Sequence, residues 1–227
     1  AMDPQQRLLM TYVWKVFEDA GYSAEALSGS RTGLFIGTAS SGYSSLIERA
    51  GTPIAGHSAI GLVPSVGPNR MSYFLNLHGP SEPVETACSS SLVAVHHGMR
   101  AIQQGVCDMA VVGGVNTLVT PDVHISMSKA EALAEDGRCK TSSEHANGYV
   151  RSEGVGMLML KGLSAAQRDG DQIYGLLRGA AINHGGRAGS LTAPNPKAQA
   201  DLLKTAYTQA GVDPRTVGYI EAHGTGT

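Results

Sequence analysis

Residues 84–105 read VETACSSSLVAVHHGMRAIQQG, and this stretch carries the clearest local signal in the sequence. The extended VETA is followed by a helical pattern that begins at Ser89 and ends at Gly105, a residue type common at helix ends. The side that this helix is expected to bury is formed by Leu92, Val95, Met99 and Ile102. The stretch therefore predicts a strand, a sharp turn and a helix.

Apolar runs and helical patterns alternate along the rest of the chain. Further strands are predicted within residues 33–37, 109–112, 156–160, 173–182 and 217–221, with a glycine pair, Gly113 and Gly114, ending the second of them. Helices are predicted over residues 4–20 and 195–210, where Asp3 and Asn195 are N-cap residues followed by proline. Residues 41–68, rich in Gly, Ser and Pro, predict short helices over the active-site face. The alternation favours an α/β fold with a largely parallel sheet covered on both faces.

The composition argues against several classes of protein. The 227 residues carry a net charge of −2, which disfavours an electrostatic grip on nucleic acid or on an anionic membrane. No window holds the roughly 18 consecutive apolar residues that a membrane span needs, and the N-terminus lacks the pattern of a secretory signal. The cytoplasm is therefore the expected location. Three widely spaced cysteines do not make a disulfide framework.

Cys88 lies at the boundary between the extended segment and the helix. The unpaired backbone N–H groups and the positive end of the helix macrodipole favour a thiolate at such a position. The same N–H groups are able to stabilise an oxyanion on an acyl group attached to the sulfur. His223 follows the predicted strand 217–221, and reactive residues of parallel sheets gather at such strand ends. From position alone, a buried cysteine beside a serine N-cap explains Cys88 as well as a nucleophile does.

The remaining cysteines and histidines do not predict a second site. Cys107 precedes a buried strand and Cys139 lies in a loop, so structural roles are expected for both. His96 and His97 are adjacent on a helix and point about 100° apart, so they cannot share one metal ion. The other histidines lack metal-ligand spacing, and neither a dinucleotide-binding nor a P-loop motif occurs. We expect no metal and no directly bound cofactor.

A set of short motifs resembles one family across nearly the whole chain. After VETACSSSL come GGVN at 113–116, DGRCKT at 136–141, GYVRSEG at 148–154, LTAPN at 191–195 and EAHGTGT at 221–227. Together and in this order they resemble the ketosynthase (β-ketoacyl synthase) domain of a modular polyketide synthase. Residues 67–83 and 183–203 are more similar to the subgroup whose modules borrow a separate acyltransferase, the trans-acyltransferase type.

The resemblance implies a thiolase-like, five-layer αβαβα condensing-enzyme fold in a homodimer. Cys88 matches the nucleophile that accepts the growing acyl chain as a thioester. His223 matches the first of two histidines that help to decarboxylate a malonyl extender and stabilise the enolate. Thr225 and Thr227 match positions that hydrogen-bond the phosphopantetheine arm of an acyl carrier protein. The implied partners are that carrier protein and neighbouring polyketide synthase domains, and the implied reaction is a decarboxylative Claisen condensation.

The resemblance also implies that the domain is partial, incomplete at both ends. The family's second histidine and its active-site lysine would lie beyond Thr227, and its first strand would lie upstream. On this basis residues 1–165 form the N-terminal half and residues 166–227 begin the C-terminal half. We expect the isolated chain to be inactive and poorly stable, because half of its sheets would lack partners. Glu85, Ser152 and residues 132–136 depart from the residues usual at these places.

Two other functions stay open at this point. A non-elongating ketosynthase-like domain, which only binds or transfers the acyl chain, would keep Cys88 and differ from a condensing enzyme after Thr227. A thiolase or a hydrolytic enzyme that uses the same thiol fits less well, because VETACSSS and EAHGTGT occur together.

Overall fold

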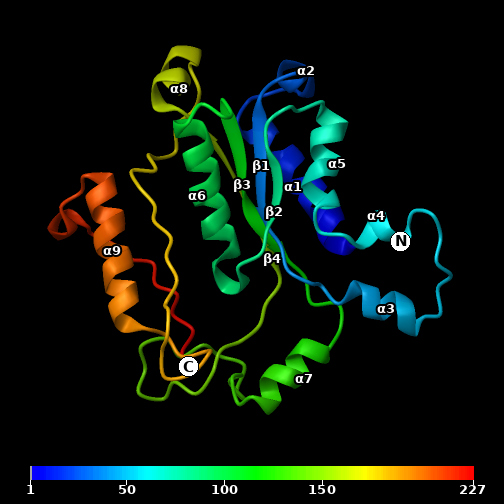
Figure 1. Ribbon diagram of the computed structural model, residues 1–227, viewed down its shortest axis with the longest axis vertical. Helices are drawn as coiled ribbons and strands as arrows, with labels where there is room; N and C mark the ends of the chain where they lie inside the picture. The colour runs from blue at the N-terminus through cyan, green and yellow to red at the C-terminus, as the bar shows by residue number, and fades with distance from the viewer. Residues whose placement is uncertain (1) are drawn as a thin grey trace. The chain divides into compact units, whose positions relative to one another are not determined.

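The computed structural model describes residues 2–227, which form two compact units (Figure 1). Unit 1 comprises Ala1–Gly162 and Ala222–Thr227, and unit 2 comprises Leu163–Glu221. The end of the chain therefore belongs to the same unit as Cys88. Every strand assigned within residues 2–227 lies in unit 1.

Unit 1 is built on a single mixed sheet of four strands. They are β1 (Thr32–Gly37), β2 (Ser81–Val84), β3 (Met109–Asn116) and β4 (Gly154–Lys161), in the spatial order β2-β1-β3-β4. Strands β2, β1 and β3 are parallel, and β4 pairs antiparallel with β3 at the edge. The parallel part was expected from the alternation of strands and helices. The antiparallel pairing of β4 was not expected, because the apolar run of β4 does not indicate the direction of the strand relative to its neighbour.

Helices cover both faces of this sheet, as Figure 1 shows. Helices α1 (Pro4–Asp19) and α5 (Val66–Leu75) pack on one face, and α6 (Ser90–Gln103) packs on the other. Leu34, Ile36 and Val111 belong to the core under α1 and α5, whereas Phe35 and Val112 belong to the core under α6. Side chains alternate between the faces of a strand, so a continuous apolar run supplies both cores. The result is three layers, helix, sheet and helix.

Helix α6 contacts the sheet mainly through small residues and only partly through the predicted apolar side. Its buried positions are Ser90, Ala94, Gly98, Met99 and Ala101. A side chain at Gly98 would collide with Cγ1 of Val112 on β3. Leu92 is 73% exposed, and Met99 alone of the four predicted residues is buried. The predicted side is confirmed in part, because Val95 and Ile102 are half-buried and pack against the core under α6. Close packing of a helix on a sheet also selects small side chains on the contact face.

The glycine pair expected to end the strand at 109–112 lies inside β3. Gly113 and Gly114 pair with Met157 and Gly156 of β4. Gly113 has a φ of +156°, and a Cβ there would meet the carbonyl oxygen of Gly156. The two glycines therefore allow the backbones of β3 and β4 to approach closely, and they do not form a turn. The strand continues to Asn116.

Local signals place the other helices of unit 1. Asp3 caps α1 by accepting a hydrogen bond from the backbone N of Gln5 at 2.8 Å, which confirms the predicted N-cap. The Gly/Ser/Pro-rich stretch holds short helices, as expected. The remaining helices of unit 1 are α2 (Ala24–Leu27), α3 (Tyr43–Arg49), α4 (Ser58–Leu62), the 3₁₀ turn η1 (Ala87–Ser89) and α7 (Asp122–Lys129).

Unit 2 contains α8 (Leu163–Asp169), α9 (Pro196–Ala210) and the 3₁₀ turn η2 (Pro214–Thr216). Asn195 caps α9 through the backbone N atoms of Lys197 and Ala198, as predicted. Within residues 2–227, neither 173–182 nor 217–221 forms a strand, although strands are predicted there. These predictions were wrong because apolar content makes a segment suitable for a sheet, but a strand exists only where a ladder partner is present.

Candidate active site

Cys88 is exposed and lies in η1, the turn that joins β2 to α6. Val84, at the end of β2, pairs with Gly37 at the end of β1, so the turn leaves the sheet at the carboxyl ends of parallel strands. Ala87, directly before Cys88, has a φ of +54°. A non-glycine residue in this left-handed region costs about 1–2 kcal/mol and is uncommon outside turns and functional sites. The strained turn presents the thiol to solvent, which removes the interpretation of Cys88 as a buried residue.

Three hydroxyl groups hold the turn around Cys88. The Oγ of Ser90 accepts the backbone N–H of Thr86 at 2.9 Å and donates to the carbonyl oxygen of Ala87 at 2.7 Å. The Oγ of Ser89 donates to the carbonyl oxygen of Thr86 at 2.8 Å and lies 2.9 Å from the Oγ1 of Thr86. The turn is thus tied on both sides of Cys88, which restrains the backbone that carries the thiol.

Two glycines of the sheet let the start of α6 approach closely. A Cβ on Gly37 of β1 would lie 2.8 Å from the backbone N of Ser91. A Cβ on Gly114, the partner of Gly37 in β3, would lie 3.0 Å from the Cβ of Ser91. Any larger side chain at Gly37 would push the first turn of α6, and Cys88 with it, away from the strand ends.

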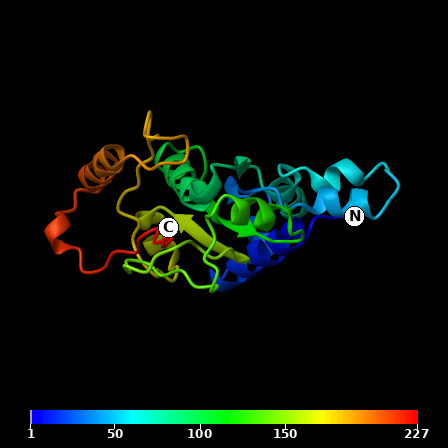
Figure 2. The ribbon, with the colours of Figure 1, turned by 90° about the horizontal axis from the view of Figure 1, so that it is seen from below.

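His223, Thr225 and Thr227 lie on the terminal segment Ala222–Thr227 of unit 1. The hydroxyl oxygens of Thr225 and Thr227 are 2.9 Å apart. Gly226 accepts a hydrogen bond from the backbone N of Gly148 at 3.0 Å, so the segment lies against the loop before β4 (Figure 2). His223 is exposed, and among the described residues no hydrogen bond joins it to Cys88. The structure therefore brings both residues into one unit, while their approach during a reaction stays a prediction.

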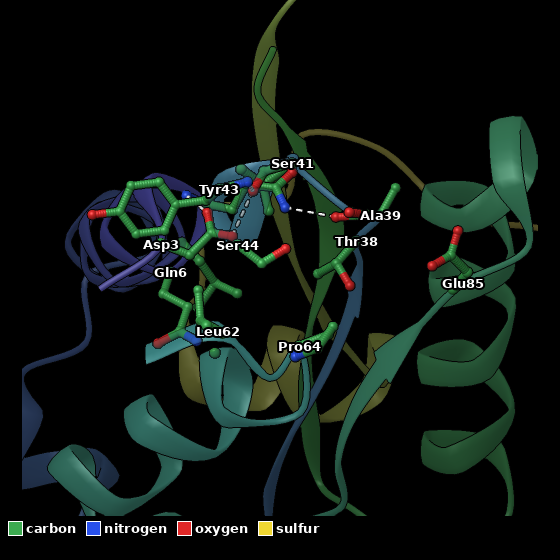
Figure 3. A pocket seen from close by; sticks show the side chains of 15 residues that line it. Asp3, Gln6, Thr38, Ala39, Ser41, Tyr43, Ser44, Leu62, Pro64 and Glu85 are labelled. Carbon is green, nitrogen blue, oxygen red and sulfur yellow. Dashed lines mark hydrogen bonds between the residues drawn. The ribbon is translucent and has the colours of Figure 1, made fainter. Parts of the chain in front are cut away.

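A cavity of about 280 Å³ opens beside the segment that leads to Cys88 (Figure 3). Asp3 and Ser41 line it, and the Oγ of Ser41 donates to the carboxylate of Asp3 at 2.6 Å. Gln6 contributes a buried Oε1 that has no hydrogen-bond partner. Glu85 stands on the opposite side of the cavity from Asp3, but neither Cys88 nor His223 lines it. Polar and apolar residues both line the cavity, which adjoins the candidate site without containing it.

The other cysteines occupy different surroundings. Cys107 is buried in the core under α6, and burial raises the pKa of its thiol. Cys139 is exposed, and its Sγ accepts a hydrogen bond from the backbone N of Val150 at 3.2 Å. Neither has the strained turn and the hydroxyl network that surround Cys88. This contrast distinguishes Cys88 as the candidate nucleophile.

His96 and His97 lie in the middle of α6 and do not reach a candidate metal site. Burial lowers the pKa of His96, and the neighbouring His97 and Arg100 lower it further. Within residues 2–227, no group of three or more His, Cys, Asp and Glu side chains is arranged to hold a metal ion. Among the same residues, no helix has the length and apolarity that crossing a membrane requires.

Residues that shape the site but do not carry its chemistry were missed in the sequence. Gly37 and Gly114 end apolar runs, which is also typical of ordinary turns. Thr86, Ser89 and Ser90 form a hydroxyl-rich pattern that fits a helix start equally well. The sign that distinguishes them is their position next to a cysteine at the junction of a strand and a helix.

Comparison with known proteins identifies the class of protein that this fold and site define. Residues 1–166 match the model of the β-ketoacyl synthase N-terminal domain, and residues 174–227 match that of the C-terminal domain. The chain belongs to the β-ketoacyl synthase family. Its sequence is 64% identical over its whole length to polyketide synthase PksN of Bacillus subtilis and 47% identical to 6-methylsalicylic acid synthase of Aspergillus terreus. It spans 4% and 12% of the lengths of these two relatives.

Solved structures agree with this assignment. The chain superposes with a TM-score of 0.92 and 41% identity on the ketosynthase from module 6 of the bacillaene synthase of Bacillus subtilis 168. The oxazolomycin ketosynthase domain OzmH KS7 of Streptomyces albus JA3453 gives a TM-score of 0.93 and 42% identity. The chain covers 39% of each of these two structures. The predicted thiolase-like α/β fold is confirmed.

Proposed function

We propose that this chain is part of a ketosynthase that forms carbon–carbon bonds in polyketide biosynthesis by decarboxylative Claisen condensation. The observation that carries the proposal is the exposed Cys88 in a strained, hydroxyl-tied turn at the start of α6. The family membership and the likeness to ketosynthases of polyketide assembly lines support it.

In the first proposed step the Cys88 thiolate attacks the thioester of an acyl chain carried by an acyl carrier protein. The bond between the acyl carbon and the carrier sulfur breaks and a bond to Cys88 forms. The carrier sulfur leaves as a thiolate and takes up the proton that the Cys88 thiol lost on ionisation. The backbone N–H groups at the start of α6 would stabilise the oxyanion that forms on the acyl group. A covalent thioester divides one difficult acyl transfer into two easier steps.

In the second proposed step a malonyl-type extender on the carrier loses CO₂ and becomes an enolate. His223, with N–H donors on its ring, would stabilise the negative charge of the enolate oxygen. The enolate carbon then attacks the acyl carbon on Cys88, the bond from carbon to sulfur breaks, and the Cys88 thiolate is released. The product is a β-ketoacyl chain on the carrier, longer by two backbone carbons. Thr225 and Thr227 are proposed to hydrogen-bond the phosphopantetheine arm during both steps.

The proposal also includes the setting in which the chain acts. Acyl carrier protein and neighbouring synthase domains are the proposed partners, consistent with the small share of each polyketide synthase relative that the chain covers. We further propose a homodimer in the cytoplasm and an extender delivered by a separate acyltransferase. Residues 1–165 and 166–227 are proposed to belong to the N-terminal and C-terminal halves of the domain, which the ranges of the two family models support.

The experiment compares Cys88→Ala with Cys139→Ala in a full-length ketosynthase domain that contains this sequence. Cys139 is the matched control because it is the other exposed thiol. We expect Cys88→Ala to abolish acyl loading, read as the mass added to the intact protein, and to lower chain extension at least 10³-fold. Loading that persists without Cys88 would contradict the proposal. Loading without extension in the unchanged domain would favour the non-elongating alternative.

A further inference from the structure

The terminal segment Ala222–Thr227, which carries His223, is held by a loop far away in the sequence. The backbone N of Gly148 donates to the carbonyl oxygen of Gly226 at 3.0 Å. The hydroxyl of Thr141 donates to the carbonyl oxygen of Gly224. Figure 2 shows the red end of the chain beside this yellow-green loop. Among the described residues, Thr141 is the one residue outside the segment whose side chain is hydrogen-bonded to it.

The segment fits this loop closely because two of its residues are glycines. Gly224 has a φ of +57° and Gly226 a φ of +74°, both in the left-handed region that favours glycine. A Cβ on Gly224 would lie 2.9 Å from the Cγ2 of Thr141. A Cβ on Gly226 would lie 3.0 Å from the backbone N of Lys140. The left-handed φ angles of the two glycines and their close contacts with Thr141 and Lys140 therefore both require glycine at these positions.

The two ends of the loop that carries Thr141 are joined by backbone hydrogen bonds. The backbone N of Ala134 donates to the carbonyl oxygen of Tyr149 at 3.0 Å, and the N of Tyr149 donates to Ala132 at 2.9 Å. The Nζ of Lys140 lies 2.7 Å from the Oδ1 of Asp136, and this hydrogen bond lowers the pKa of the Asp136 carboxyl. Thr141 thus extends from an ordered loop.

We propose that Thr141 is a positioning residue that orients His223 for the decarboxylation and condensation steps. Gly224 directly follows His223, so a hydrogen bond to the Gly224 carbonyl restricts the rotation of the backbone that carries the imidazole. Thr141 touches neither the thiol nor the substrate in this proposal and acts through the His223 loop. The inference rests on the proposed function, because it assigns His223 a role in the second step.

The variants that test this inference are Thr141→Val, which keeps the shape but removes the hydroxyl, and Thr141→Ser, which keeps the hydroxyl. Thr141 is exposed, so neither change is expected to prevent folding. Thr205→Val is the matched control, since the Thr205 hydroxyl also donates to a backbone carbonyl, that of Asp201, within α9 of unit 2. All are made in the full-length ketosynthase domain.

We expect Thr141→Val to load acyl chains on Cys88 at the normal rate and to lower kcat for extension about tenfold. Misplacement of a catalytic group by about 1 Å costs up to about 100-fold in rate, which sets the scale. The KM for the extender carrier should change little. Thr141→Ser should restore most of the extension rate, and Thr205→Val should match the unchanged domain.

The outcomes separate this inference from the proposed function. If the unchanged domain loads but does not extend, the proposed function is overturned, and the role of Thr141 falls with it. If the unchanged domain extends and Thr141→Val extends equally fast, the role of Thr141 alone is overturned. A Thr141→Val variant that loses loading and extension together, or that Thr141→Ser does not rescue, would indicate a general structural role and also overturn the inference.

Discussion

Units 1 and 2 both contain apolar runs that predict strands, but only the runs of unit 1 form a sheet. In unit 1 the apolar runs at 32–37 and 109–116 pair in a sheet with helices on both faces, and their side chains are buried. In unit 2 the comparable runs at 173–182 and 217–221 stay outside any strand, and Leu176 and Ile220 are 55% and 75% exposed. Ala166 is the one buried residue among those described in unit 2. An apolar run is therefore not a strand until another strand pairs with it.

The two long helices α6, in unit 1, and α9, in unit 2, repeat the contrast. α9 has a side-chain N-cap, a proline at its first position and a left-handed glycine at its end, yet no residue of it is buried. α6 has no side-chain cap hydrogen bond but buries five residues against the sheet. Caps decide where a helix begins and ends, whereas burial decides how firmly it is held.

The largest difference between the units is expected in amide hydrogen exchange. Amides of β1 and β3 in this 227-residue chain should be protected by at least about 10³-fold, and amides of 175–182 by less than about tenfold. In a full-length domain, where a ladder partner can pair with them, the amides of 175–182 should gain protection. Mass spectrometry measures the exchange of both regions. Equal protection of β1, β3 and residues 175–182 in the 227-residue chain would contradict the difference between the two units.

Replacing leucine by alanine should lower the free energy of unfolding by several kcal/mol more in unit 1 than in unit 2. Leu34 in β1 is fully buried, so Leu34→Ala should lower the free energy of unfolding by about 2–5 kcal/mol. Leu203 in α9 is 58% exposed, so Leu203→Ala in the same chain should change it by less than about 0.5 kcal/mol. Urea titration of the two variants measures both values, and similar losses would mean that unit 2 has a core of its own.

The two N-cap residues should differ by a smaller amount. The Asp3 carboxylate accepts from the N of Gln5 and from the Oγ of Ser41 and is buried, so Asp3→Ala also removes the acceptor of the buried Ser41 hydroxyl. We expect a cost of about 2–3 kcal/mol. Asn195→Ala, in the less buried cap of α9, should cost about 1 kcal/mol. Thermal unfolding compares them, and a larger loss for Asn195→Ala would reverse the expected order.

The smallest effect concerns pH and α6. Because burial lowers the pKa of His96 in the folded chain, protonation is easier in the unfolded chain. Above a pH of about 6.5, the usual pKa of a histidine in an unfolded chain, His96 therefore does not change the free energy of unfolding. As the pH falls below that value toward the lower pKa of the folded chain, the free energy of unfolding decreases. His96→Gln should flatten the stability curve between pH 7 and pH 5, and His57→Gln, at an exposed side chain, is the control. A His96→Gln curve that falls as steeply as that of the unchanged chain would remove this explanation.

Much of the candidate site follows from sequence, because the motifs are local. VETACSSS predicts a cysteine at a junction of strand and helix, and the structure places Cys88 in that turn. The hydroxyls of Thr86, Ser89 and Ser90 act within four residues of one another. The contact of Thr141 with the His223 loop joins positions 83 residues apart, and no local pattern indicates it.

The sequence by itself determined where α1 and α9 begin, which runs are apolar and which family the motifs resemble. These properties depend on residues within a few positions of one another, through caps, periodicity and side-chain chemistry. The tertiary structure decided that α6 packs by its small residues, that β3 runs through its glycine pair and that the chain end returns to unit 1. Each of these depends on which distant backbone lies close enough to exclude a side chain or to accept a hydrogen bond, and distance along the chain does not encode that.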